Sequence, residues 1–173
     1  MHETRVNLKH LLEDIRDSYA LTLEEVIIVE LIANSLDSDA SKIDFSVNPF
    51  TQTFTVLDNG QGMRRQALKE YHNIAASTKL RGTGIGFAGI GAKLSLLVAD
   101  SVITETKAGR STHAATTWHL SSDTRAPWQF IPCPGTVTAS RGTAVTITLA
   151  DPNSALLRAK FIQQTIISHF YPL

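Results

Sequence analysis

The change in hydrophobic period near residue 43 limits the folds that this chain can adopt. Upstream of it, apolar residues recur at helical spacing over Leu8–Tyr19, and a second run follows the capping box that starts at Thr22 and ends at Glu25. From Ile43 onward, apolar residues alternate with polar ones, which is typical of a half-buried strand. The pattern predicts two helices, the second long, largely buried and ending at residues 38–40, and then strands.

Most of the predicted strands follow one another without a helix between them. The pattern predicts strands at residues 43–47, 54–56, 102–106, 112–120, 128–133 and 145–149. Further helices are predicted at 65–74, at 92–98, and from Asp151 to His169, with Asp151 as the cap and Pro152 at the first helical position. We therefore expect one α+β domain over residues 1–173, a two-layer sandwich with a mixed, mostly antiparallel sheet and helices on one face.

The composition of the chain excludes some classes of function. The 173 residues carry 16 basic and 16 acidic side chains, so there is no basic excess to support strong non-specific nucleic-acid binding. The single cysteine, Cys133, excludes an internal disulfide and a cysteine-based metal site, and the histidines show no metal-ligand spacing. This favours a reducing, intracellular location. The N-terminus lacks a signal-peptide core, and the apolar window Gly82–Ala99 contains Lys93, so no membrane association is expected.

Glycines crowd the stretch GTGIGFAGIGAKLS at residues 82–95. Gly84, Gly86 and Gly89 match a dinucleotide-binding fingerprint, but the residues before them cannot form the buried strand that this fingerprint needs. A Walker-type phosphate loop is absent, because Ala92 rather than glycine precedes Lys93. Two interpretations stay open: a helix start packed closely against a neighbour, or an anion site at a helix N-terminus.

Two other groups of residues have the character of a site. Glu30, Asn34 and Asp37 share one face of the second predicted helix. They form either a solvated stripe or a carboxylate that activates water beside an amide oxygen that holds Mg²⁺. The stretch from Asp58 to Met63, DNGQGM, contains a hairpin-like Asn-Gly pair. Its flanks read as a strand and a helix, however, and a carboxylate followed by glycines can accept a hydrogen bond from an exocyclic amine.

Taken in order, these motifs resemble those of the GHKL ATPases, which include gyrase, the ninety-kilodalton heat-shock chaperones, histidine kinases and MutL. The resemblance covers about residues 22–170 and is strongest to the MutL- and chaperone-like members. It rests on four motifs, which are Glu30-x-x-x-Asn34, Asp58-x-Gly60-x-Gly62, the loop from Gly84 to Gly91, and Arg141-Gly142-Thr143. The resemblance implies a Bergerat-type ATP-binding fold.

The resemblance also implies roles for individual residues. Glu30 matches the general base that activates the attacking water, and Asn34 matches the Mg²⁺ ligand. Asp37 stands where the family often has an aspartate near the nucleotide. Asp58 matches the carboxylate that bonds the adenine amino group, with support from Thr143 through a shared water.

The remaining assignments concern the adenine wall and the phosphates. The adenine wall is matched by Gly60, Gly62 and Met63. The lid end that wraps the phosphates is matched by Gly84, Gly86, Gly89 and Gly91. Lys79, in a Ser-Thr-Lys stretch of the lid, is a candidate phosphate contact. Lys93 is interpreted as a helix-surface lysine.

As a member of such a family, the chain is expected to be an Mg²⁺-dependent ATPase that binds ATP and ADP. ATP binding would close the lid and drive homodimerisation or engagement of a partner, in the cytoplasm or in a nucleus. Family members usually take a γ-phosphate cation from a following domain, so the chain is expected to be an N-terminal fragment with slow turnover, or to receive that cation from a partner. DNA could be involved through other domains. The alternatives are a nucleotide-sensing module with negligible turnover and a kinase domain that phosphorylates a partner protein.

Overall fold

The described part of the chain is built on one antiparallel sheet. The structure, a computed structural model, describes residues 6–74, 91–109 and 112–171. Within these residues the sheet has six strands in the order β1-β2-β6-β3-β4-β5, and every pairing is antiparallel. The strands are β1 (Ile43–Asn48), β2 (Thr53–Asp58), β3 (Ala99–Ala108), β4 (Thr112–Trp118), β5 (Trp128–Ile131) and β6 (Gly142–Leu149).

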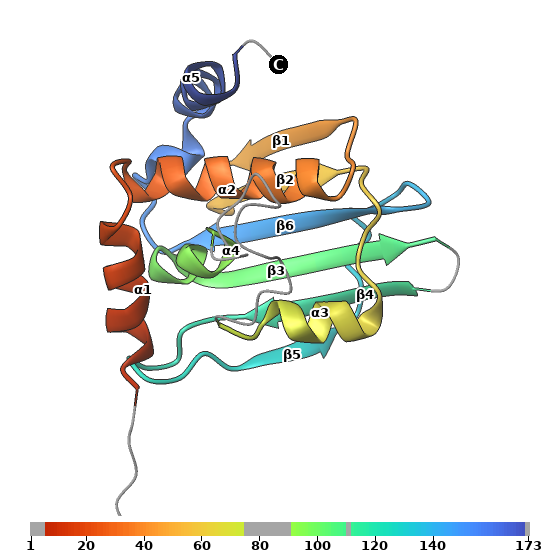
Figure 1. The fold of residues 1–173 in the computed structure, drawn as a ribbon, viewed down its shortest axis with the longest axis horizontal. Helices are drawn as coiled ribbons and strands as arrows, with labels where there is room; N and C mark the ends of the chain where they lie inside the picture. The colour runs from red at the N-terminus through yellow and green to blue at the C-terminus, as the bar shows by residue number, and fades with distance from the viewer. Residues whose placement is uncertain (1–5, 75–90, 110–111, 172–173) are drawn as a thin grey trace, which may run out of the picture.

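The helices form a second layer. They are α1 (Leu8–Asp17), α2 (Leu23–Asp37), α3 (Arg65–Tyr71) and α4 (Gly91–Leu94), followed by the 3-10 turn η1 (Ser95–Leu97), and later η2 (Ala155–Leu157) and α5 (Ala159–Phe170). Figure 1 shows α2, α3 and α4 in front of one face of the sheet, with α1 at the left beside the strand ends and α5 beyond the β1 edge. The predicted two-layer α+β architecture is therefore confirmed.

The core lies between the sheet and α2. Phe54 on β2 is paired with Ile147 on β6, and both side chains are fully buried. Ile27 and Ile28 on α2 are fully buried in the same cluster. Burial of one such side chain stabilises the fold by about 1.5–3 kcal/mol. This packing holds α2 against the β2–β6 centre of the sheet.

The start of α2 follows from a local motif. The Thr22 hydroxyl accepts a hydrogen bond from the Glu25 backbone N–H at 3.3 Å, and the Glu25 carboxylate accepts one from the Thr22 backbone N–H at 2.9 Å. This reciprocal pair satisfies two backbone donors that the first turn of a helix leaves free. The capping box predicted from the sequence is confirmed.

The last helix begins later than predicted. The Asp151 carboxylate accepts a hydrogen bond from the Asn153 N–H at 2.8 Å and caps a turn instead of a helix. Leu156 and Leu157, in η2, are then buried in the core. The extended backbone of Arg158 ends that turn, and α5 begins at Ala159. Burial of the two leucines redirects the chain, which the cap pattern alone does not reveal.

Other element ends differ by a few residues. The strand predicted to end at Cys133 ends at Ile131, because Pro132 has no N–H to donate to the ladder. The strand predicted to reach Leu120 ends at Trp118, and the helix predicted to reach Ile74 ends at Tyr71. The helix predicted over residues 92–98 is α4 followed by η1.

Candidate functional site

Asp58 ends β2 on the helix side of the sheet and is buried, with 9% of its surface exposed. Its Oδ1 accepts hydrogen bonds from the Gly60 N–H at 2.8 Å and from the Thr143 N–H at 3.3 Å. The Ser35 Oγ lies 3.1 Å from Oδ2 and 3.0 Å from the Leu31 carbonyl oxygen, so these two acceptors share one hydroxyl proton. Burial raises the pKa of Asp58, although these hydrogen bonds oppose the rise. The result is an oriented carboxyl group held from two strands and a helix.

The segment after Asp58 is fitted tightly between neighbours. Gly62 has φ +70°, and a Cβ there would lie 2.1 Å from the Lys107 carbonyl oxygen, so the position favours glycine. The Met63 N–H donates to the Thr106 Oγ1 at 2.8 Å, and the Thr143 Oγ1 lies 3.1 Å from the same hydroxyl. The predicted adenine wall is thus attached to β3 and β6. A Cβ at Gly60 would lie 2.0 Å from the Ser38 Oγ. Because glycine has no Cβ, the segment can pack closely against the end of α2.

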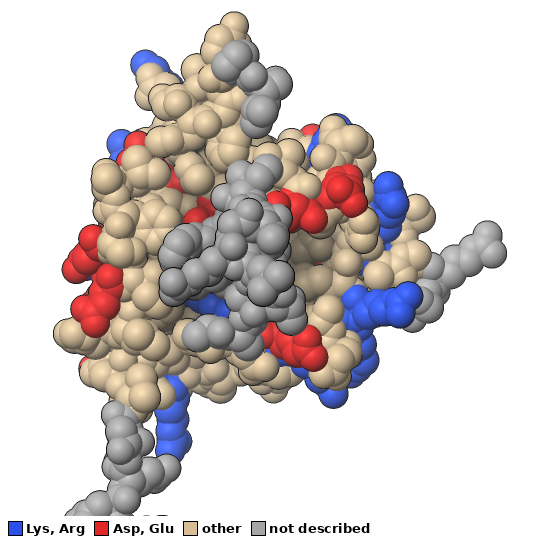
Figure 2. Space-filling view, viewed as in Figure 1, with Lys and Arg blue, Asp and Glu red and all other residues tan. Residues whose placement is uncertain are grey.

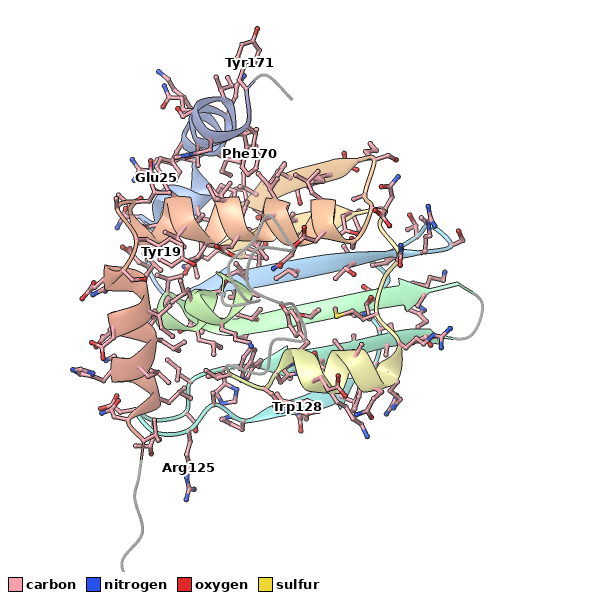
Figure 3. All side chains as sticks on the ribbon, in the orientation of Figure 1. Tyr19, Glu25, Arg125, Trp128, Phe170 and Tyr171 are labelled. Atoms are coloured by element: carbon pink, nitrogen blue, oxygen red, sulfur yellow. The ribbon has the colours of Figure 1, made fainter. Side chains whose placement is uncertain are left out.

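Glu30 is the second buried carboxylate of this region, with 4% of its surface exposed on α2. The Tyr19 hydroxyl, which follows α1, donates a hydrogen bond to the Glu30 Oε1 at 3.0 Å. Burial and the negative charge of Glu30 raise the pKa of Tyr19. Figure 3 shows Tyr19 where the end of α1 meets the start of α2. Asn34 and Asp37 follow on the same helix and are both half-buried.

Gly91 joins the glycine stretch to Glu30. It is the first residue of α4, and a Cβ there would lie only 1.8 Å from the Glu30 Cβ. No other residue type allows the two backbones to approach so closely. Of the two interpretations of the glycine stretch, close helix packing is therefore what Gly91 shows. Lys79, Gly84, Gly86 and Gly89 lie outside the described residues.

The interpretation of Lys93 as a surface lysine is wrong. It lies on α4 with 2% of its surface exposed, and its Nζ donates to the Asn73 carbonyl oxygen. Burial lowers the pKa of Lys93. None of the ion pairs found among the described residues involves it. Gly91 packs α4 closely against α2. The Lys93 side chain, two residues further along α4, is therefore enclosed within the helix layer.

Sequence reasoning missed Tyr19, Ser35 and Thr106 as contacts of the site. No spacing rule connects Tyr19 with Glu30, which lies on a different helix. Thr106 meets Met63 only because β3 pairs with β6. Lys93 did carry a signal, since it is a charged residue inside the apolar window Gly82–Ala99.

Comparison with known proteins identifies the family of the chain. Residues 21–134 match the family described as histidine kinase-, DNA gyrase B- and HSP90-like ATPases. This chain therefore belongs to that family, the GHKL group predicted from the motifs, whose domains generally bind ATP with Mg²⁺.

A curated relative aligns with most of the chain. The chaperone protein HtpG of Mesorhizobium japonicum is 30% identical over a 159-residue alignment, which covers 84% of this chain and 24% of the relative. The chain thus spans about a quarter of the length of that relative. In the described residues, no helix is long and apolar enough to cross a membrane.

The charges on the helix face are mixed. In Figure 2 acidic atoms lie over α1 and beside the grey segment in the centre, whereas basic atoms gather mainly toward the right-hand edge. The view shows no continuous basic field, which agrees with the balance of 16 basic and 16 acidic residues. Among the described residues, this view therefore shows no basic patch of the kind that binds a nucleic-acid backbone.

Proposed function

We propose that this chain binds ATP with Mg²⁺ and hydrolyses it, and that nucleotide binding drives lid closure and dimerisation or engagement of a partner. The observation that carries the proposal is the position of two buried carboxylates along one helix. Glu30 lies on α2 itself, and Asp58 contacts Ser35 of the same helix. One carboxylate would recognise the base at one end of the nucleotide, and the other would act on water at the phosphate end.

Asp58 is suited to the adenine role. Three neighbours fix its orientation, and a carboxylate has about four lone-pair sites, so acceptor capacity remains for an exocyclic amine. Gly60, Gly62 and Met63 would face the ring, and the contacts of the last two with β3 would keep that wall in place. Thr143 would assist through its N–H, which already reaches Asp58.

The phosphate end would combine water activation with charge neutralisation. Glu30 would orient and deprotonate the attacking water. Asn34 would supply an amide oxygen to Mg²⁺, an ion that needs few protein ligands and completes its shell with water and phosphates. Asp37 lies on the same helix and would complete the polar stripe near the nucleotide. Gly84, Gly86, Gly89 and Lys79 remain candidate phosphate contacts by family resemblance.

Lys93 would supply positive charge from within this chain. Among the described residues, the Lys93 ammonium meets the Asn73 carbonyl oxygen, and a buried ammonium is costly unless an anion also faces it. Lys93 lies two residues beyond Gly91 on α4, and Gly91 is packed against Glu30. A phosphate oxygen near this point would offset the burial of the charge. The chain would then need a cation from a following domain or a partner only to reach its full rate.

Calorimetric titration with a non-hydrolysable ATP analogue, with and without Mg²⁺, tests this function. We expect the wild type to bind more tightly with Mg²⁺, and Asp58→Asn to lose roughly ten- to a hundredfold in affinity. Asp44→Asn is the matched control, because Asp44 is exposed on β1 and pairs with Lys42. Unchanged binding by Asp58→Asn would overturn the adenine assignment.

Three further measurements separate the possible outcomes. Phosphate release by the wild type tests hydrolysis, and its absence despite tight binding would indicate a nucleotide-sensing module instead. Transfer of labelled γ-phosphate to a partner protein would indicate a kinase. Light scattering with and without the analogue tests dimerisation.

A further inference from the structure

A buried carboxylate lies on the face of the sheet that α1 to α4 do not cover. Along β3, Thr106 points to the helix layer, where its hydroxyl meets Met63. Side chains alternate along a strand, so its neighbour Glu105 points to the opposite face. Glu105 nevertheless has only 1% of its surface exposed. A segment that follows β5 must therefore shield it.

The contacts of Glu105 identify that segment. Its Oε1 accepts hydrogen bonds from the His113 Nε2 at 2.6 Å and from the Gly135 N–H at 3.2 Å. Its Oε2 accepts one from the Thr136 N–H at 2.8 Å. The carboxylate thus fastens the chain after β5 to the centre of the sheet, and the backbone donors fix its orientation.

The fold brings the only cysteine to the same place, beside ligands of other residue types, although the cysteine count alone predicts no cysteine-based metal site. Ala115 on β4 pairs with Glu105 on β3 and with Ile131 on β5. His113 lies two residues from Ala115 on β4, so the pleat directs its side chain to the face of Glu105. Cys133 follows two residues after Ile131, just beyond the end of β5. One ligand atom from each of Glu105, His113 and Cys133 lies within 4.8 Å of the other two.

We propose that Glu105, His113 and Cys133 form a binding site for a borderline divalent metal ion such as Zn²⁺. Thiolate, imidazole and carboxylate are the three side-chain groups that bind this ion. Bond lengths of about 2.0–2.3 Å in a tetrahedral site place ligand atoms roughly 3.3–3.8 Å apart. The present separations, from 2.6 Å between the His113 Nε2 and the Glu105 Oε1 up to 4.8 Å, would have to change by at most about 1.5 Å. Water would take the fourth position.

Metal binding at this site would release one proton and leave the ion and its ligands without net charge. The metal replaces the proton on the His113 Nε2, and this proton moves through water to the Nδ1, so the neutral ring keeps one proton. The Cys133 thiol releases its proton to water, so one proton leaves for each ion bound. The thiolate and the carboxylate then neutralise the two positive charges. The Thr136 N–H would continue to hold the carboxylate as an outer-shell donor.

The site is open to solvent and distinct from the proposed nucleotide site. The His113 side chain is 37% exposed, so an ion can enter and the ring can move. Mg²⁺, a hard ion that prefers oxygen ligands, does not suit a site with a thiolate and an imidazole. An ion bound here would join the end of β5 to β3 and β4.

Protection of Cys133 from alkylation tests the site in the unmodified chain. Because the chain has a single cysteine, the rate of thiol modification reports on this position alone. After removal of metals with a chelator, we expect Zn²⁺ to slow modification at least tenfold and Mg²⁺ to leave the rate unchanged. Equal rates with and without Zn²⁺ would overturn the proposal.

Titration with Co²⁺, a spectroscopic substitute for Zn²⁺, tests the ligand set. We expect one ion per chain, with a thiolate-to-metal absorption band that Cys133→Ser abolishes and His113→Gln weakens. His10→Gln is the matched control, because His10 also contacts a carboxylate, that of Asp14 at 3.1 Å, but its pair is exposed. Metal binding that persists equally in Cys133→Ser and His113→Gln would overturn the site, as would loss of binding in His10→Gln alone.

Discussion

The Tyr19 hydroxyl donates a hydrogen bond to the Glu30 Oε1 at 3.0 Å and so connects the residue after α1 to the proposed general base on α2. Tyr19 is half-buried and Glu30 is buried. A hydrogen bond to a buried carboxylate restricts its orientation, and a catalytic base must be well oriented to act. Tyr19 is therefore a candidate positioning residue.

Replacing Tyr19 with Phe removes this donor and keeps the ring. We expect ATP hydrolysis to fall roughly tenfold, because an orienting bond worth about 1.4 kcal/mol in the transition state is lost. Affinity for a non-hydrolysable ATP analogue should stay within about twofold of the wild type. The comparison of kcat with KM distinguishes this role from a structural one. A variant that loses affinity and turnover equally would contradict it.

Glu30→Gln keeps the shape of the proposed base but cannot accept a proton. Since general base catalysis contributes about 10²–10⁴-fold, phosphate release should fall at least a hundredfold while ATP binding persists. Glu24→Gln is the control, because Glu24 lies in the first turn of the same helix. If Glu30→Gln hydrolysed ATP at the wild-type rate, Glu30 would not be the base.

Lys93→Met replaces a buried charge with an apolar chain of similar length. We expect the melting temperature of the free protein to stay constant or rise, because a buried ammonium is costly without an anion. ATP affinity should fall roughly ten- to a hundredfold, since a charge-assisted contact worth about 1.5–3 kcal/mol is lost. A lower melting temperature with normal ATP affinity would show that Lys93 only supports the fold.

The buried position of His72 leads us to expect that the stability of the fold depends on pH. It is buried, with Nδ1 at 2.8 Å from the Leu68 carbonyl oxygen, and its ring stacks on Trp128 at 4.2 Å. Burial, and also the charge of Lys93, lower the pKa of His72 in the folded state. As pH falls below the ordinary value of about 6.5, the unfolded chain therefore takes up the proton first. The free energy of unfolding should decrease from about pH 6.5 down through the folded pKa.

Denaturant unfolding across this pH range checks the effect. His72→Phe retains a ring against Trp128 but cannot titrate, so its stability should fall less steeply below about pH 6.5 than that of the wild type. His10→Gln, at an exposed histidine, should leave the wild-type slope unchanged. Parallel curves for the wild type and His72→Phe would refute the assignment.

Local patterns could predict much of the fold. The capping box at Thr22 marks the start of α2, and the alternation from Ile43 marks β1, because both depend on contacts between near neighbours in the chain. The start of α5 could not be predicted in this way. Asp151 and Pro152 form a valid helix start, but burial of Leu156 and Leu157 imposes a separate turn first.

The candidate site shows the same division. The sequence by itself determined the order of the motifs and placed Glu30, Asn34 and Asp37 on one helix, because helical spacing is a local property. Only the tertiary structure decided that Gly91 is packed against Glu30 and that Lys93 is buried. A short helix with one lysine looks the same in sequence whether it lies on the surface or within a layer.

Contacts between strands were decided by the tertiary structure alone. Thr143 reaches Asp58 because β6 lies next to β2, although the two residues are 85 positions apart in the sequence. Glu105, His113 and Cys133 meet for the same reason, which spacing rules for metal ligands do not detect. Period and capping are encoded by neighbours along the chain, whereas strand order is set by burial of the whole sheet against the helices.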